Sequence, residues 1–166
     1  MMIVDKPPAP SIHLKNAFYH SPIGWLKIAC DDAAIVSVQF VDNEGEPSSQ
    51  QPPLLQGCIA QLCDYFQGLR KNFELPLAPQ GTAFQKLVWK KLLEIPFGTT
   101  ASYGDIAHRI GEPRAVRAVG RANGQNPIAI IIPCHRVIGA DGKLVGYGAG
   151  LWRKQWLLQH EQRMLI

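Results

Sequence analysis

The chain has 166 residues, a mass of 18.4 kDa and a formal net charge of +4, with 46% hydrophobic and 18% charged residues. That length allows one domain or two small ones, and the balance of apolar to charged residues excludes a globally disordered chain. No apolar run approaches the ~18 residues that a membrane-spanning helix needs, so a membrane protein is excluded as well.

The predicted elements of the first half form a small α/β unit. Residues 1–11 are expected to be a loose arm, and an acid and three prolines interrupt it before the apolar stretch of a signal peptide could form, which predicts a cytoplasmic protein. Residues 23–30 and 34–40 are rich in β-branched and aromatic residues and predict a hairpin. A polar loop over residues 42–53 and a helical period over residues 54–69 follow.

Two prolines and a glycine punctuate residues 76–81, where we place the boundary between a domain of residues 1–80 and a domain of residues 81–166. The charge changes sign at the same point. The chain up to residue 83 holds five Lys/Arg and eight Asp/Glu, whereas residues 84–166 hold twelve and five. A basic character confined to one half is typical of a polyanion binder, although a solvated charged surface would give the same count.

The second domain is predicted to be mainly helical. Amphipathic spacing predicts a helix over residues 84–92. Ser102 and Asp105 form the pattern of a capping box that opens a short helix, and Gly111 stands where such a helix would end. Pro113 then suits the first turn of another helix. Two short helices around a tight glycine-containing turn predict a helix-turn-helix.

The second of these helices carries an arginine stripe. At 100° per residue, Arg114, Arg117 and Arg121 fall within about 60° of one another. Small residues line the neighbouring face and two valines, further round, should pack inward: Ala115, Ala118, Ala122, Val116 and Val119. We expect the alanines to let the helix approach a groove and the arginines to reach phosphates or enter the base stack. The alternative is a solvated arginine face.

A second chemical feature follows that helix. Residues 128–133 are predicted to be a buried strand, which runs directly into Cys134, His135 and Arg136. A thiol must ionise to act as a nucleophile, and an imidazole and a guanidinium nearby could favour the thiolate. Adjacent residues do not face each other on a regular helix or strand, so either the chain turns at Pro133 or a water bridges the two side chains.

The other three cysteines fit small buried apolar residues: Cys30, Cys58 and Cys63. The four cysteines contain no C-x-x-C pair, and no companion histidine pair is present, so no metal is expected.

The last segment is predicted to hold a turn, a loop and a helix. Asp141-Gly142 suits the turn, and the small residues of positions 146–150 could close over a flat ligand. Residues 151–159 predict a helix whose core positions are Trp152, Trp156 and Leu157. Glu161, taken alone, has the pattern of an exposed terminal acid.

Several motifs, in matching order and spacing, resemble the O6-alkylguanine-DNA alkyltransferase family: Pro133-Cys134-His135-Arg136-Val137, Asn126-Pro127, Phe97-Gly98, Ser102-Tyr103, Arg117-Ala118-Val119-Gly120 and Leu157-Leu158-Gln159-His160-Glu161. The match is strong over residues 80–161 and loose over residues 12–79. The resemblance implies an α+β protein. Its small N-terminal domain would be ribonuclease-H-like, with an antiparallel sheet and a helix, and its C-terminal domain winged-helix-like, with a helix-turn-helix.

The resemblance also implies single-turnover DNA repair, in which an alkyl group moves from O6 of guanine to Cys134. O4-alkylthymine is left open as a second substrate. His135 would act through a water as the base, with Glu161 orienting its imidazole. Asn126 would fix the segment that carries the thiolate, and Tyr103 would hydrogen-bond or protonate N3 of the departing guanine.

The remaining site residues follow from the same resemblance. Arg117 would fill the space left by a flipped nucleotide, with further DNA contacts from Arg114, Arg121, Ala118 and Arg136. Substrate contacts would come from Tyr103, Val137, Tyr147, Gly148, Ala149 and Lys154. Some relatives carry a hydroxyl residue in place of Gly148, so only backbone N–H groups could contact O6 here.

No cofactor is expected, and the predicted partner is double-stranded DNA containing O6-alkylguanine, bound by a monomer. Two alternatives stay open. A DNA-binding module without chemistry, such as a regulator or a lesion sensor, would share the basic half and the helix-turn-helix. A Cys-His hydrolase would instead turn over many small molecules without DNA.

Overall fold

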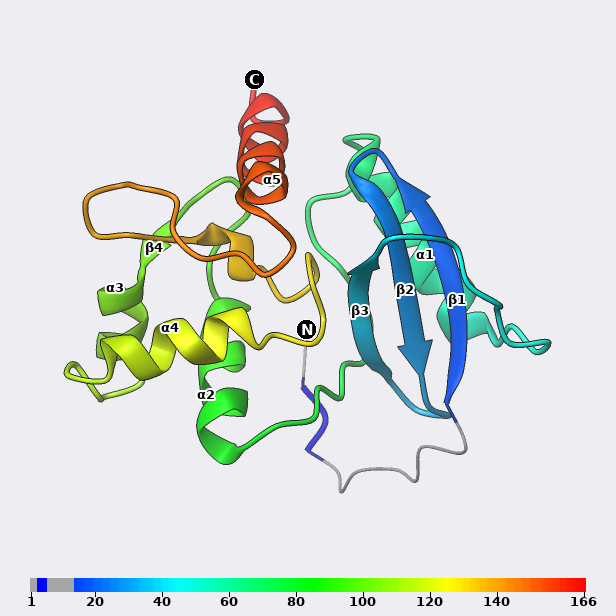
Figure 1. Ribbon diagram of the computed structural model, residues 1–166, viewed down its shortest axis with the longest axis horizontal. Helices are drawn as coiled ribbons and strands as arrows, with labels where there is room; N and C mark the ends of the chain where they lie inside the picture. The colour runs from blue at the N-terminus through cyan, green and yellow to red at the C-terminus, as the bar shows by residue number, and fades with distance from the viewer. Residues whose placement is uncertain (1–2, 6–13) are drawn as a thin grey trace. The chain divides into compact units, whose positions relative to one another are not determined.

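The computed structural model describes residues 3–5 and 14–166 and divides into two compact units (Figure 1). The first unit is Met1–Gln80 with Pro127–Ala129, and the second is Gly81–Asn126 with Ile130–Ile166. The segment Pro127–Ala129 therefore lies with the first unit, whereas the division at residue 80 assigned it to the second. Most of the expected N-terminal arm lies outside the described residues, but the Val4 N–H donates to the Leu77 carbonyl at 2.7 Å.

An antiparallel sheet in the order β1 (Lys15–Ser21), β2 (Gly24–Cys30), β3 (Ile35–Val41) forms the first unit. The predicted hairpin is β2–β3. Its turn is fixed by Asp31, whose Oδ1 accepts hydrogen bonds from the backbone N–H groups of the two alanines that follow, at 2.8 and 2.9 Å. β1 was not predicted from the sequence, because its run KNAFYHS lacks β-branched residues.

Helix α1 (Pro53–Phe66) packs against β1 and β2 and closes the core of the first unit (Figure 1). Its inward side chains are fully buried or nearly so, as are those of the sheet beneath it: Leu55, Cys58, Leu62, Tyr65, Phe66, Leu26, Ile28 and Val38. Two of the cysteines expected in the core, Cys30 and Cys58, are buried, and Cys63 is half-buried.

The buried strand predicted over residues 128–133 is wrong. Ile128 makes a single parallel bridge to Val38, and the chain then turns. Ile130 has φ +72°, a left-handed conformation that a β-branched residue rarely adopts. The isoleucines are buried as expected. The apolar run therefore predicts burial correctly, but it does not predict the backbone conformation.

The second unit is mainly helical, with α2 (Ala83–Leu92), α3 (Tyr103–Arg109), α4 (Val116–Gly124) and α5 (Leu151–Arg163). Two short strands, β4 (Ala101–Ser102) and β5 (Val137–Ile138), pair in parallel. The predicted α+β class is confirmed. None of the described helices is long and apolar enough to cross a membrane.

Helix α3 begins and ends as its sequence predicts. Ser102 and Asp105 form a complete capping box, with hydrogen bonds of 3.0 and 2.9 Å. Gly111 has φ +78°, and its N–H donates to the His108 carbonyl while the next N–H donates to Ala107, which is a Schellman motif. Residues 110–115 then connect α3 to α4, and the two helices pack against each other.

Helix α5 differs from its prediction at one core position. Leu157 is buried and Trp156 is half-buried, stacked on His160 with ring centroids 4.8 Å apart. Trp152 is 55% exposed, because it stands in the first turn of the helix, and Arg153 covers one face of its indole.

Candidate active site

Cys134 opens a short 3-10 helix, η2 (Cys134–Arg136), in the second unit. The chain turns through Ile130–Pro133, and the Cys134 N–H donates to the Ile132 carbonyl at 2.8 Å. The turn expected at Pro133 is therefore present, and Cys134 and His135 are consecutive residues of the 3-10 helix. The thiol is reduced and the residue is only 5% exposed.

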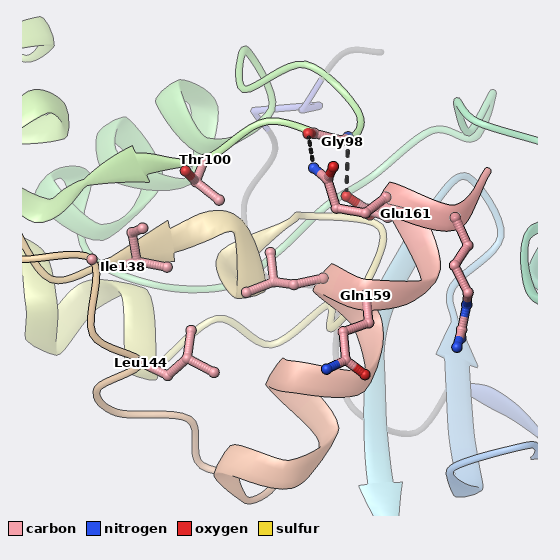
Figure 2. A pocket seen from close by; sticks show the side chains of 10 residues that line it. Gly98, Thr100, Ile138, Leu144, Gln159 and Glu161 are labelled. Carbon is pink, nitrogen blue, oxygen red and sulfur yellow. Dashed lines mark hydrogen bonds between the residues drawn. The ribbon is translucent and has the colours of Figure 1, made fainter. Parts of the chain in front are cut away.

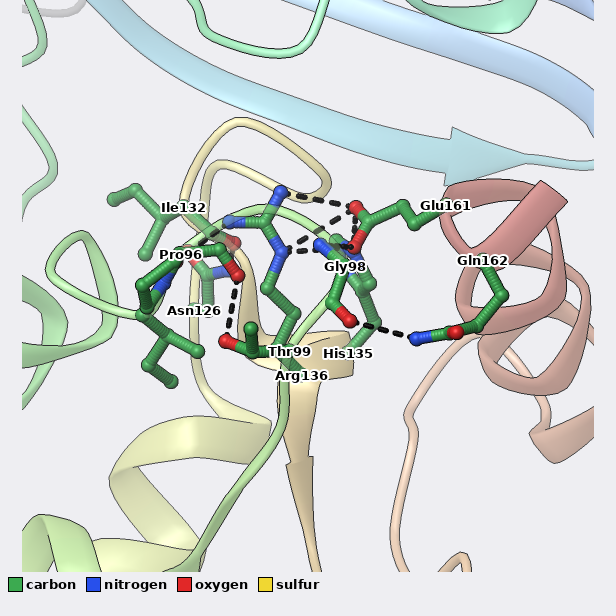
Figure 3. Close-up of polar contacts among 10 residues, drawn as sticks. Pro96, Gly98, Thr99, Asn126, Ile132, His135, Arg136, Glu161 and Gln162 are labelled. Atoms are coloured by element: carbon green, nitrogen blue, oxygen red, sulfur yellow. Dashed lines mark hydrogen bonds and ion pairs between the residues drawn. The ribbon is translucent and has the colours of Figure 1, made fainter. Parts of the chain in front are cut away.

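Two side chains counter the cost of burying a thiolate at Cys134. Burial raises the pKa of this thiol, whereas a hydrogen bond with Asn126 and the charge of Lys154 lower it. The Asn126 amide also donates to the Ile132 carbonyl at 2.8 Å, which anchors it beside the thiol (Figure 3). The sequence had suggested His135 and Arg136 as the groups that favour the thiolate, but the structure assigns this part to Asn126 and Lys154.

His135 is completely buried, and its Nε2 lies 2.8 Å from Oε1 of Glu161. A carboxylate only accepts, so Nε2 carries the proton and Nδ1 is the unprotonated nitrogen. Burial lowers the pKa of His135 and keeps it neutral, although Glu161 opposes this shift. Within the described residues, Nδ1 has no hydrogen-bond partner. A neutral imidazole with a free acceptor nitrogen beside a thiol is suited to remove the thiol proton, directly or through a water.

Glu161 is held from three sides, although it has the sequence pattern of an exposed terminal acid. Arg136 binds it through two nitrogens, and the Gly98 N–H donates to its Oε2 at 3.2 Å (Figure 3). Burial alone would raise the pKa of Glu161, but the hydrogen bonds and charges of His135 and Arg136 hold this pKa well below its usual range. The carboxylate therefore stays ionised and can orient His135.

Arg136 is a buried ion-pair partner rather than the DNA contact predicted for it. It is 7% exposed, its Nη1 donates to the Ile95 carbonyl at 2.8 Å, and its guanidinium lies 5.5 Å from the centre of the Phe97 ring. With all three nitrogens engaged by the protein, the guanidinium is turned away from solvent. The resemblance gave Arg136 as a DNA contact, whereas the carboxylate that neutralises it comes 25 positions later in the chain.

Three predicted substrate residues lie around the thiol. Lys154 is fully buried and donates to the Val145 carbonyl at 3.1 Å, and the Tyr103 hydroxyl donates to the same oxygen at 2.8 Å. Burial raises the pKa of both Tyr103 and Tyr147, and the nearby Cys134 raises it further. The Tyr147 hydroxyl is buried without a hydrogen-bond partner in the described part of the chain. Polar side chains therefore surround Cys134.

The loop between β5 and α5 carries the other predicted substrate contacts. Val137 is buried in β5, Gly148 is exposed, and the Ala149 carbonyl accepts a hydrogen bond from Arg153 at 2.7 Å. Sequence reasoning did not single out Arg153. Arg153 binds the Ala149 carbonyl and Lys154 binds the Val145 carbonyl, so the two side chains hold this loop against the first turn of α5.

The arginine stripe is exposed, as a DNA-binding surface requires. Arg117, Ala118 and Arg121 lie on the outer face of α4. Arg114 is exposed as well but precedes the helix, which begins at Val116, so the predicted start at Pro113 was too early. Two neighbours also differ from expectation, because Val116 is 39% exposed and Ala122 is buried.

Sequence reasoning missed one buried polar residue on the same helix. Asn123 is 2% exposed, and its amide donates to the Cys134 carbonyl at 3.4 Å. A signal was available, since Asn123 lies four positions after the buried Val119 and therefore on the inward face.

A pocket of about 510 Å³ is lined in part by Glu161 and Gly98 (Figure 2). Its walls include Thr100, Ile138 and Leu144, and it reaches Gly98 and Glu161. The Gln162 amide donates to the Gly98 carbonyl at 2.6 Å and closes one end. Cys134 does not line this pocket. Among the described residues, no group of three or more His, Cys, Asp or Glu side chains could hold a metal ion.

Two family models cover most of the chain. Residues 14–79 match the ribonuclease-like domain of 6-O-methylguanine DNA methyltransferase, and residues 83–163 match the DNA-binding domain of the same family.

Individual relatives agree with these models. A methylated-DNA–protein-cysteine methyltransferase of Mycolicibacterium paratuberculosis is 51% identical over 86% of this chain and 89% of its own length, and one of Methanosarcina acetivorans is 49% identical over 87% and 96%. The crystal structure of the O6-methylguanine methyltransferase of Mycobacterium tuberculosis superposes with a TM-score of 0.82 at 47% identity, covering 91% of this chain and 94% of that one. A structure of the Mycobacterium tuberculosis protein in complex with DNA superposes with a TM-score of 0.81 at 47% identity, covering 89% of this chain and 92% of that one. The chain therefore belongs to the 6-O-methylguanine DNA methyltransferase family.

Proposed function

We propose that this protein repairs DNA by moving an alkyl group from O6 of guanine to the sulfur of its own Cys134, once per molecule. The observation that carries the proposal is a buried thiol next to a neutral imidazole, whose free nitrogen is left unprotonated by the His135–Glu161 hydrogen bond. Duplex DNA with O6-alkylguanine is the proposed partner, and O4-alkylthymine stays open as a second substrate. Each chain carries the full set of site residues, so we propose that it acts as a monomer, in the cytoplasm.

The step balances without a cofactor. His135 takes the thiol proton through a water, and the Cys134 thiolate attacks the alkyl carbon. The carbon–sulfur bond forms as the carbon–oxygen bond breaks, and the electron pair passes to guanine O6. The guanine gains a proton at N3 from Tyr103, and the proton that His135 took from the thiol returns through solvent to the Tyr103 oxygen, so both side chains end in their starting protonation states. The product is a thioether, a stable carbon–sulfur bond, so each chain reacts once.

Tyr103 must change partners to act in this way. Its hydroxyl donates to the Val145 carbonyl at 2.8 Å, an oxygen that also accepts from Lys154. We propose that the Tyr103 hydroxyl donates instead to N3 of the bound guanine. Lys154 stays hydrogen-bonded to the Val145 carbonyl and keeps the loop in place.

The target atom lies inside a duplex, so the nucleotide must be extruded, which costs about a few kcal/mol. We propose that the exposed Arg117 fills the resulting space and that Arg114 and Arg121 bind phosphates. Sequence preference should then be weak, because phosphate contacts carry no base information.

Intact mass measurement after incubation with a duplex carrying one O6-methylguanine tests the proposal. Transfer predicts a gain of one methylene unit, mapped by peptide analysis to Cys134, and no gain for Cys134→Ser, which should still bind the duplex. Binding without a mass change would favour a lesion sensor. Turnover of many substrate molecules per chain without DNA would favour the Cys-His hydrolase.

A further inference from the structure

Helix α4 has two faces with different contacts. Its outer face carries Arg117 and Arg121, and its inner face carries Asn123, which reaches the backbone of the nucleophile. The Cys134 carbonyl accepts from the Val137 N–H that ends η2 and from the Asn123 amide. One side chain of the arginine-bearing helix therefore contacts the peptide group of Cys134.

The inner end of α4 is held firmly by α2. The Trp89 indole N–H donates to the Ala122 carbonyl at 2.9 Å, and Trp89 is 1% exposed. One residue further along the chain than Asn123, the exposed Gly124 ends the helix, and Gln125 accepts a hydrogen bond from Gln85 at 2.8 Å. The buried Trp89–Ala122 hydrogen bond holds the last turn of α4 in place beside Asn123, whereas the Gln85–Gln125 contact is exposed.

Asn123 is an energetically unfavourable residue at this buried position. Its Oδ1 is buried with no hydrogen-bond partner within the described residues. A buried acceptor without a partner destabilises the folded state, and an apolar side chain of similar shape would not carry that penalty. Packing alone would therefore favour leucine over asparagine here.

We propose that Asn123 is a positioning residue, whose amide fixes the peptide group of Cys134 from the DNA-binding helix and thereby aims the sulfur at the alkyl carbon. The inference rests on the proposed alkyl transfer. Asn123 does not touch the reacting atoms; it acts through the backbone of Cys134, while Asn126 and Lys154 act on the sulfur itself.

The test compares Asn123→Leu, which keeps the number and branching of the side-chain heavy atoms and removes both the amide donor and the unpaired oxygen, with Gln125→Leu. Gln125 lies on the same turn, and its amide bonds Gln85 rather than the nucleophile. Three quantities are measured for each variant and for the wild type: the thermal unfolding temperature, the affinity for an undamaged duplex, and the rate of methyl transfer from O6-methylguanine DNA. The pH dependence of Cys134 alkylation by iodoacetamide adds a readout of the thiol that does not need DNA.

For Asn123→Leu we expect an unchanged or higher unfolding temperature, unchanged duplex affinity, and transfer slowed about tenfold or more, since a small misplacement of a reacting group costs this much. The pH profile of iodoacetamide alkylation should also change, and Gln125→Leu should match the wild type in transfer rate. Wild-type transfer rate and an unaltered alkylation profile in Asn123→Leu would overturn the inference while leaving the proposed function intact. A loss of rate that only parallels a loss of folded protein would overturn it as well. Absence of methyl transfer in the wild type would instead overturn the proposed function.

Discussion

Arg136 and Glu161 form a buried ion pair in which Nε of the arginine lies 3.0 Å from Oε2 of the glutamate and Nη2 lies 2.9 Å from Oε1. The same glutamate accepts a hydrogen bond from His135 at 2.8 Å. Arg136 thereby stabilises the ionised carboxylate that sets the tautomer of the imidazole beside Cys134. If His135 is the base that we propose, the arginine of the Pro-Cys-His-Arg motif acts through Glu161 to orient that base.

Arg136→Ala should unfold more easily and react more slowly. Removing one partner of a buried ion pair leaves the other charge uncompensated and costs about 3–5 kcal/mol. Denaturant unfolding monitored by tryptophan fluorescence measures this change. Arg136→Lys keeps the charge but loses the bidentate geometry, so its free energy of unfolding should lie between those of the wild type and Arg136→Ala. Stability equal to wild type in both variants would show that the pair contributes nothing.

Glu161→Gln should change how stability depends on pH. The pKa of Glu161 in the folded protein lies below its ordinary value of 4.5, so its ionised form stabilises the fold fully above that value. The contribution is lost progressively as the pH falls from there through the lowered folded pKa. The difference in unfolding free energy between wild type and variant should therefore be largest near pH 7 and shrink below pH 4.5. A difference that does not vary with pH would contradict the assigned direction.

Lys154→Met should shift the pH dependence of alkyl transfer upward. The positive charge of Lys154 lowers the pKa of Cys134, so its removal raises that pKa and moves the rising limb of the rate profile to higher pH. Rates with free O6-benzylguanine between pH 6 and pH 10 would show the shift. Lys143→Met removes the same charge from a side chain that is 79% exposed and should leave the profile in place. Identical shifts in both variants would point to a general charge effect.

Arg117→Ala should slow repair of duplex DNA more than reaction with free O6-benzylguanine, because only the duplex requires extrusion of a nucleotide. We expect about a tenfold larger loss on DNA, corresponding to roughly 1.4 kcal/mol. The ratio of the two second-order rate constants is the measurement. Lys27→Ala, which removes an exposed charge from β2 in the other unit, serves as the control. Equal losses on both substrates would refute the proposed role of Arg117 in the duplex.

Local signals were read correctly where a few neighbouring residues determine the backbone. The capping box of Ser102 and the stop at Gly111 depend on residues three to five positions apart, and both are present. The apolar run over residues 128–133 is compatible with a strand and with a buried turn. In the structure only Ile128 forms a bridge, and the chain turns at the left-handed Ile130.

The sequence pattern does not show which residues, far apart in the chain, form ion pairs and hydrogen bonds with each other. Nothing near Arg136 in the sequence shows that Glu161 will neutralise it, and the resemblance gave this arginine as a DNA contact. Asn123 stands among alanines and arginines, so nothing in the sequence marks it as a site residue. Only the fold brings the Cys134 carbonyl within reach of its amide. The resemblance named Cys134, His135, Glu161, Asn126, Tyr103 and Lys154, and the structure groups them in the second unit.

The central claim is that Cys134 accepts the alkyl group and keeps it. The most direct measurement mixes reduced protein with an excess of duplex whose O6-methylguanine carries a tritiated methyl group, and follows the label. The account predicts that label moves from DNA to protein until one methyl is bound per chain, and that it stays there, on the peptide containing Cys134. Label that remains in the DNA after prolonged incubation, or that reaches the protein at another residue, would contradict it.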